Sequence, residues 1–178
     1  GDTLDTRDIL HVQMELKKPL EGLETVDFIV NHHPSKYGGE KVSGQKRMAA
    51  MRALKNLTDS LNHAGPAPRT VIAMGDFNDT PDSEPFGLMK GTLVNKGVPL
   101  HEKGLGTIRY DGKWDLIDMC LVGPEIAPDT GMEILKVPFL MVRDTKHPGE
   151  KPLRTYSGPK HLGGDGDHRP IILKFREK

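Results

Sequence analysis

Two polar side chains follow directly on a short apolar run near the middle of the chain, in VIAMGDFNDTP (71–81). Because side chains alternate along an extended chain, Asp76 and Asn78 should point to one side and Phe77 to the other. A carboxylate can bind a hard cation or a water molecule, and an amide can donate to a phosphate oxygen. We therefore interpret Asp76 and Asn78 as site residues, and Asp79 as a turn residue.

Histidine stands at two other places where an apolar run meets a loop. His32 and His33 follow VDFIV (26–30), and Asp167-His168 directly precedes PIILKF. The imidazole changes charge near neutral pH, so it suits proton transfer or contact with phosphate. Adjacent side chains on an extended chain point apart. We interpret His32 as a site residue and His33 as an ordinary loop histidine, whereas a site and a surface turn explain Asp167-His168 equally well.

Asp118 is a carboxylate inside the apolar run LIDMCLV (116–122). A buried charge is costly unless it is paired. A histidine is one natural partner, since the carboxylate would orient its ring and stabilise its cationic form. A structural hydrogen bond to the backbone explains Asp118 equally well.

Residues 36–55 carry six lysines and arginines against Glu40 alone. Such a cluster could steer a phosphate-bearing substrate toward a site. It is more often the solvated face of a helix, and that is the interpretation we favour for most of these residues.

Apolar periodicity indicates the elements that must position these side chains. A helix is predicted to begin at a Ser43 cap, to bury Ala50, Leu54, Leu57 and Leu61 on one face, and to end at AGPAPR (64–69). Ser83 could cap a short helix over EPFGLMK (84–90). Strands are predicted at 9–16, 26–30, 71–74, 116–122 and 170–175, and residues 123–169 are predicted to form mainly loops.

Composition limits the function classes. The 178 residues suit one domain, and 25 basic against 25 acidic residues give zero net charge, which argues against coating nucleic acid by bulk charge. The single cysteine cannot form an intrachain disulfide, and no apolar run is long enough for a membrane span. The N-terminal GDTLDTRD shows no targeting pattern, so the compartment is unknown and an extracytoplasmic one is left open.

The order of these signals resembles the endonuclease/exonuclease/phosphatase superfamily. Asn-His ends a strand, Gly-Asp-Phe-Asn ends the next, Ile-Asp lies in a late strand, and Asp-His precedes the last. The segments VNHHPSKYGG, GTIRYDGKWDLID and LRTYSGPKHLGGDGDH look especially like its uncharacterised bacterial branch. The resemblance implies an α/β (α+β) fold, the C-terminal part of a four-layer α/β/β/α sandwich with two packed, mainly antiparallel sheets. It implies one domain over residues 1–178.

The resemblance also implies roles in proton transfer and phosphate binding. His32 would contact the phosphate or protonate the leaving oxygen, and Asp76 would orient or activate the attacking water. Asn78 would hold the phosphate. His168 would be a second base or phosphate contact, and Asp118 would orient it.

A divalent cation, Mg²⁺ or Mn²⁺, is the implied cofactor. By resemblance, Asp167 would be a ligand of the cation, and Asp76 and Asn78 are further candidate ligands. The family's metal-binding glutamate has no counterpart here, since neither Glu15 nor Glu24 stands in the expected context.

We therefore expect the chain to be the C-terminal portion of a longer protein. A half-sandwich would expose an apolar sheet face, so the missing N-terminal half, a homo-oligomer or a swapped segment should cover it.

The expected function is a metal-dependent phosphoesterase, a nuclease or a phosphatase, that hydrolyses a phosphodiester or phosphomonoester by in-line water attack. Zero net charge and 5% aromatic residues offer little support for a nonspecific nuclease. The alternative is a truncated or degenerate, non-catalytic domain that binds phosphorylated ligands or a protein partner.

Overall fold

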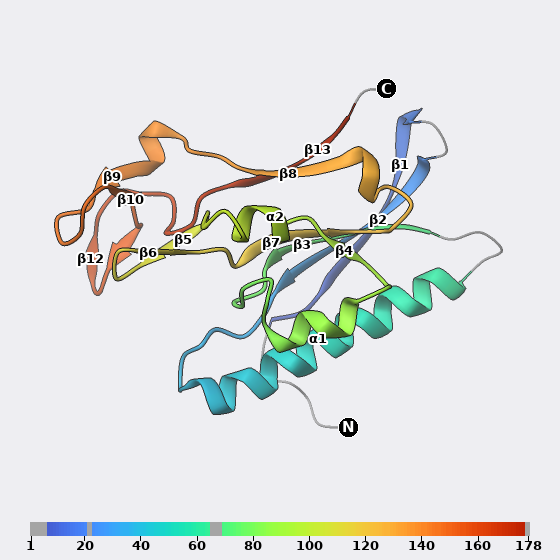
Figure 1. The fold of residues 1–178 in the computed structure, drawn as a ribbon, viewed down its shortest axis with the longest axis horizontal. Helices are drawn as coiled ribbons and strands as arrows, with labels where there is room; N and C mark the ends of the chain where they lie inside the picture. The colour runs from blue at the N-terminus through green and yellow to red at the C-terminus, as the bar shows by residue number, and fades with distance from the viewer. Residues whose placement is uncertain (1–6, 21–22, 65–68, 177–178) are drawn as a thin grey trace.

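A five-stranded sheet forms the centre of the computed structural model, which describes residues 7–20, 23–64 and 69–176 (Figure 1). Its strands follow the order β1-β2-β3-β7-β4. β1 and β2 are antiparallel, β2 and β3 are parallel, and β7 is antiparallel to both β3 and β4. The strands are β1 (Leu10–Leu20), β2 (Leu23–His32), β3 (Thr70–Asp76), β7 (Asp118–Val122) and β4 (Val94–Asn95).

Helix α1 (Glu40–His63) connects the parallel strands β2 and β3 and lies along one face of the sheet (Figure 1). The predicted apolar periodicity is confirmed, since Leu54 and Leu61 join Ile29 and Val71 in one buried cluster. The predicted Ser43 cap is wrong. The helix already begins at Glu40, and the Ser43 hydroxyl donates within the first turn to the carbonyl of Gly39. Residues 65–68 of the predicted helix end lie outside the described residues.

One basic residue of α1 does not lie on its solvated face. The Arg47 side chain is only 1% exposed, and its Nε donates to Asp79 at 2.7 Å. The predicted solvated face is therefore wrong for Arg47. Asp79 does lie in the bend after β3, but its carboxylate pairs with the helix. This contact fixes the bend after β3 to α1.

A two-stranded antiparallel sheet of β8 (Thr130–Ile134) and β13 (Ile171–Phe175) lies on the side of the central sheet opposite α1 (Figure 1). Leu173 packs with the buried residues Val26, Ile72 and Val122 of the central sheet. The mixed α+β class predicted from the sequence is confirmed. The complete two-sheet sandwich with helices on both sides stays a prediction.

Short elements fill the rest of the described chain. Residues 123–169, predicted to be mainly loop, contain β8 and six of these short elements, each two or three residues long. These elements are η1 (Glu84–Met89), α2 (Val98–His101), β5 (Ile108–Tyr110), β6 (Lys113–Asp115), η2 (Ala127–Asp129), η3 (Pro138–Leu140), β9 (Met141–Arg143), β10 (Glu150–Pro152), β11 (Tyr156–Ser157) and β12 (Lys160–His161).

Apolar side chains remain exposed where β1 and β2 pair. Leu10, Val12 and Met14 alternate along β1, and Val30 lies opposite Leu10 in the register. We call these four residues the β1–β2 stripe. They share a sheet face with Val26, which β13 helps to bury. Among the described helices, none is long and apolar enough to cross a bilayer.

Candidate functional site

The parallel pairing of β2 and β3 brings His32 beside Asp76, since the two residues are register partners at the ends of their strands. His32 Nε2 lies 3.4 Å from Asp76 Oδ2. Gly75 makes this close pairing feasible. It has φ 134°, and a Cβ at this position would lie 2.0 Å from the carbonyl oxygen of Asn31. Only glycine fits there.

The carboxylate of Asp76 is held by the residue two positions later. Asp76 Oδ1 accepts from the Asn78 backbone N–H at 2.8 Å, and Oδ2 accepts from Asn78 Nδ2 at 3.1 Å. Asn78 adopts φ 52°, a conformation that asparagine tolerates better than most residues. Phe77 is fully buried on the other side, as the predicted alternation requires. Burial raises the pKa of Asp76, and the charge of Asp118 raises it further, although the Asn78 hydrogen bond acts in the opposite direction.

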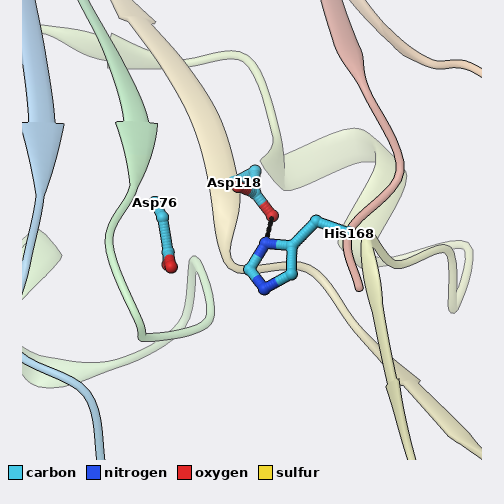
Figure 2. A group of neighbouring side chains, drawn as sticks. All are labelled: Asp76, Asp118 and His168. Atoms are coloured by element: carbon cyan, nitrogen blue, oxygen red, sulfur yellow. Dashed lines mark hydrogen bonds and ion pairs between the residues drawn. The ribbon is translucent and has the colours of Figure 1, made fainter. Parts of the chain in front are cut away.

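His168 reaches the same place from the segment before β13. Its Nδ1 lies 2.8 Å from Asp118 Oδ2, with Asp118 at the start of β7 (Figure 2). Burial by itself would lower the pKa of His168. The hydrogen bond and charge of Asp118, with the charges of Asp76 and Asp167, outweigh burial and raise that pKa. Taken alone, Asp118 and His168 each had two explanations in the sequence, and the fold places the two side chains in contact.

Figure 2 shows Asp76 facing the Asp118–His168 pair across the ends of β3 and β7. One ligand atom from each of these three residues lies within 4.8 Å of the others. They line a cavity of about 740 Å³ together with His32, Asp167 and several loop residues. The cavity therefore joins two imidazoles to several carboxylates, a combination suited to binding a cation and moving protons.

Asp167 lines this cavity but lies outside the three-residue group. Its Oδ2 is 3.4 Å from an Arg154 guanidinium nitrogen, and both side chains are 44% exposed. His168 Nε2 lies 3.8 Å from Asp167 Oδ1. Asp167, the predicted metal ligand, is therefore already paired with the guanidinium of Arg154.

His33 is not the ordinary loop histidine that the sequence suggested. It is 2% exposed, and its ring meets the edge of Phe77 at a centroid distance of 4.9 Å. Burial, with the neighbouring charges of Arg47 and His32, lowers its pKa to about 4. Its carbonyl accepts from Asn78 Nδ2 at 2.9 Å, so His33 supports the site through its backbone.

Two neighbours of the site were not singled out in the sequence, Arg154 and Thr107. Thr107 is fully buried, and its hydroxyl lies beside the backbone of Asp118. The dipeptide Asp111-Gly112 could have indicated its position. Both residues have positive φ and form the two-residue turn of the β5–β6 hairpin. This turn reverses the chain, so that Asp115 returns to lie beside Thr107.

Comparison with protein-family models matches residues 1–177 to the Endonuclease/Exonuclease/phosphatase family. Comparison with curated proteins gives no match.

Solved structures share the fold at low identity. Beta toxin from Staphylococcus aureus superimposes with a TM-score of 0.58 at 15% identity, over 94% of this chain and 57% of that chain. A beta toxin mutant with bound magnesium ions gives 0.57 at 17% identity, with the same coverage. Sphingomyelinase C from Streptomyces griseocarneus gives 0.56 at 13% identity, over 95% of this chain and 57% of that chain. The chain therefore spans 57% of the length of these three neighbours.

Proposed function

Because the chain belongs to the endonuclease/exonuclease/phosphatase family, we propose that its cavity is the active site of a phosphoesterase. One observation carries the proposal: the Asp118–His168 pair faces Asp76 within 4.8 Å, in a cavity also lined by His32. Phosphate-ester hydrolysis needs a group that takes a proton from water and groups that stabilise charge on the phosphoryl oxygens. This set of side chains supplies both.

His168 is suited to meet the phosphoryl group. Its pKa is raised by Asp118, which favours the imidazolium near neutral pH. With Nδ1 directed at Asp118, Nε2 is the nitrogen that can donate to a phosphoryl or leaving oxygen. Asp118 therefore fixes both the charge and the orientation of the ring.

Asp76 is suited to receive a proton from the attacking water. Burial raises the pKa of Asp76 toward the pH of the solution, and a general base works best when its pKa lies near that pH. The two hydrogen bonds from Asn78 hold the carboxylate in one orientation. His32 Nε2 lies 3.4 Å from Asp76 Oδ2 and can contact the same substrate oxygens.

The carboxylates around the cavity fit a divalent cation. Magnesium and manganese prefer oxygen ligands. Asp76 would hold the ion together with Asp167, once Asp167 is released from its ion pair with Arg154, and Asn78 would be a further oxygen donor. Such a cation supplies charge stabilisation at the phosphoryl oxygens. A structural neighbour, the beta toxin mutant, contains bound magnesium ions, which supports the choice of metal.

Asp76→Asn tests the proposal. It keeps the shape of the side chain and removes the proton acceptor, so we expect the turnover number to fall by about 10²–10⁴-fold. The assay follows hydrolysis of bis(p-nitrophenyl) phosphate and p-nitrophenyl phosphate, with and without Mg²⁺ or Mn²⁺. The relative rates on the two substrates assign the diester or monoester class.

Asp82→Asn is the matched control for this substitution, because Asp82 is a carboxylate in the loop that follows β3, with 70% of its side chain exposed. It should retain the wild-type rate. Equal rates for Asp76→Asn and the wild-type protein would refute the role given to Asp76.

A non-catalytic phosphate-binding domain is the second candidate. The ion pair between Asp167 and Arg154 favours it, since that pair occupies a carboxylate that the cation requires. Calorimetric binding of inorganic phosphate without turnover of either ester would support this candidate over the enzyme.

A further inference from the structure

We propose that Thr107 is a positioning residue that sets the placement of Asp118 and thereby the Asp118–His168 pair. The inference deepens the proposed function, and its effect on turnover rests on that function. Thr107 itself faces no substrate, because its side chain is fully buried.

The Thr107 hydroxyl oxygen lies at the backbone that leads into Asp118. Oγ1 accepts from the N–H of Asp118 at 3.3 Å and from the N–H of Ile117 at 3.4 Å. The Ile117 carbonyl in turn accepts from the N–H of Phe77 at 2.8 Å, next to Asp76. One hydroxyl thus anchors the start of β7, at the point where β7 meets the end of β3.

The backbone of Thr107 holds the other partner of the pair. Its carbonyl accepts from the N–H of Arg169 at 2.8 Å, and its neighbour Ile108 forms an isolated antiparallel bridge with His168. Side chain and backbone of Thr107 therefore bind the two segments that meet in the Asp118–His168 hydrogen bond. A shift of Thr107 changes the distance between them.

Packing fixes Thr107 itself. Its N–H donates to the carbonyl of Asp115 at 2.9 Å. The preceding Gly106 lies so close to Asp115 that a Cβ there would approach its backbone to 2.6 Å. The hydrogen bond and this close approach hold Thr107 against β6, so its hydroxyl works as a fixed acceptor.

Thr107→Val keeps the volume and branching of the side chain and removes the acceptor. We expect kcat to fall by about 10–100-fold, the loss that displacement of a catalytic group by about 1 Å produces, with KM nearly unchanged. Thr107→Ser restores the hydroxyl and should recover most of kcat. Should Thr107→Val fail to fold, Thr107→Cys replaces the oxygen by a weak acceptor and should show the same loss.

Thr58→Val is the matched control. Thr58 is also fully buried, but its hydroxyl donates to the Leu54 carbonyl inside α1. This variant should lower stability while leaving kcat unchanged.

A readout independent of turnover is the proton shared by His168 Nδ1 and Asp118, observed by NMR as a low-field imidazole resonance that is lost in His168→Gln. Thr107→Val should shift or broaden it, whereas Thr107→Ser and Thr58→Val should leave it in place. If the wild-type protein hydrolyses neither ester, the proposed function fails and the NMR comparison still tests Thr107. An unshifted resonance in Thr107→Val, or a kcat equal to that of Thr58→Val, overturns the inference.

Discussion

Arg154 forms an ion pair with Asp167 and would compete with a cation in the proposed site for that carboxylate. The two lie 3.4 Å apart and are nearly half exposed, so the pair contributes little to stability. Arg154→Ala should raise the affinity for Mg²⁺ by up to about fivefold, since an exposed ion pair is worth at most about 1 kcal/mol. Isothermal titration calorimetry with MgCl₂ measures the change.

Lys136→Ala is the control for Arg154, because Lys136 forms an exposed ion pair with Glu150. It removes the same charge from a pair that the cavity does not include. Equal affinities for the Arg154 and Lys136 variants would show that net charge, and not release of Asp167, governs binding. Asp167→Asn should weaken binding in either background.

His33 should make the fold sensitive to acid. Its pKa is lowered from 6.5 to about 4, so as the pH falls the unfolded chain takes up the proton before the folded one. The contribution of the neutral His33 ring to the free energy of unfolding is fully present above pH 6.5 and is lost as the pH falls toward 4. The difference is on the order of 3 kcal/mol.

Urea unfolding between pH 4 and 7 measures this dependence. His33→Gln cannot take up the proton, so its free energy of unfolding should fall less steeply with decreasing pH than that of the wild-type protein. His63→Gln removes an exposed histidine and should keep the wild-type slope. Parallel slopes for the wild-type protein and His33→Gln would contradict the burial argument.

At the scale of elements, helix α1 is fixed to the bend after β3 by the buried pair of Arg47 and Asp79. Removing one partner of a buried pair leaves the other charge uncompensated. Arg47→Ala should therefore lower the free energy of unfolding by about 3 kcal/mol or more. Arg52→Ala, an exposed arginine of the same helix, should change it by about 0.5 kcal/mol at most. Similar losses in the two variants would refute a buried role for Arg47.

The elements that could be predicted from the sequence are those with a clear apolar period. The apolar runs correctly indicated β3, β7 and β13, and the helical spacing of Leu54 and Leu61 correctly indicated α1. The burial of Arg47 could not be predicted, because its partner Asp79 is 32 positions away and only the parallel pairing of β2 and β3 brings it to the helix. The same holds for His33, whose ring packs against Phe77, the residue that directly follows β3.

At the scale of the whole molecule, the β1–β2 stripe leaves apolar surface in contact with water. We expect a second copy of the chain, a swapped segment or a further part of the same protein to cover it, since such surface favours association. Sedimentation velocity should show concentration-dependent association that Val12→Lys weakens. Gln13→Lys, on the opposite face of β1, should leave association intact. A monomer at every concentration would exclude self-association through the stripe.

The candidate site was predicted as a set of residues with one contact among them, in which Asp118 orients His168, and the hydrogen bond between these two residues is present in the structure. The order of motifs indicated His32, Asp76, Asp118 and His168, and the structure brings these four residues to one cavity. The placement of Asp167 beside Arg154 depends on the loop that precedes β11, for which the sequence offered no periodic signal.

The Asp118–His168 contact joins residues 50 positions apart, and His168 stands just before β13, the last of the described strands. Contacts between distant parts of a chain cost the most loop entropy and are slow to form. A chain that has built α1 and the central sheet but has not yet docked β13 would already contain much of its secondary structure. It would still lack the histidine of its proposed active site. Hydrolytic activity would then appear only with the completed fold, so a nascent or partly unfolded molecule would not hydrolyse phosphate esters.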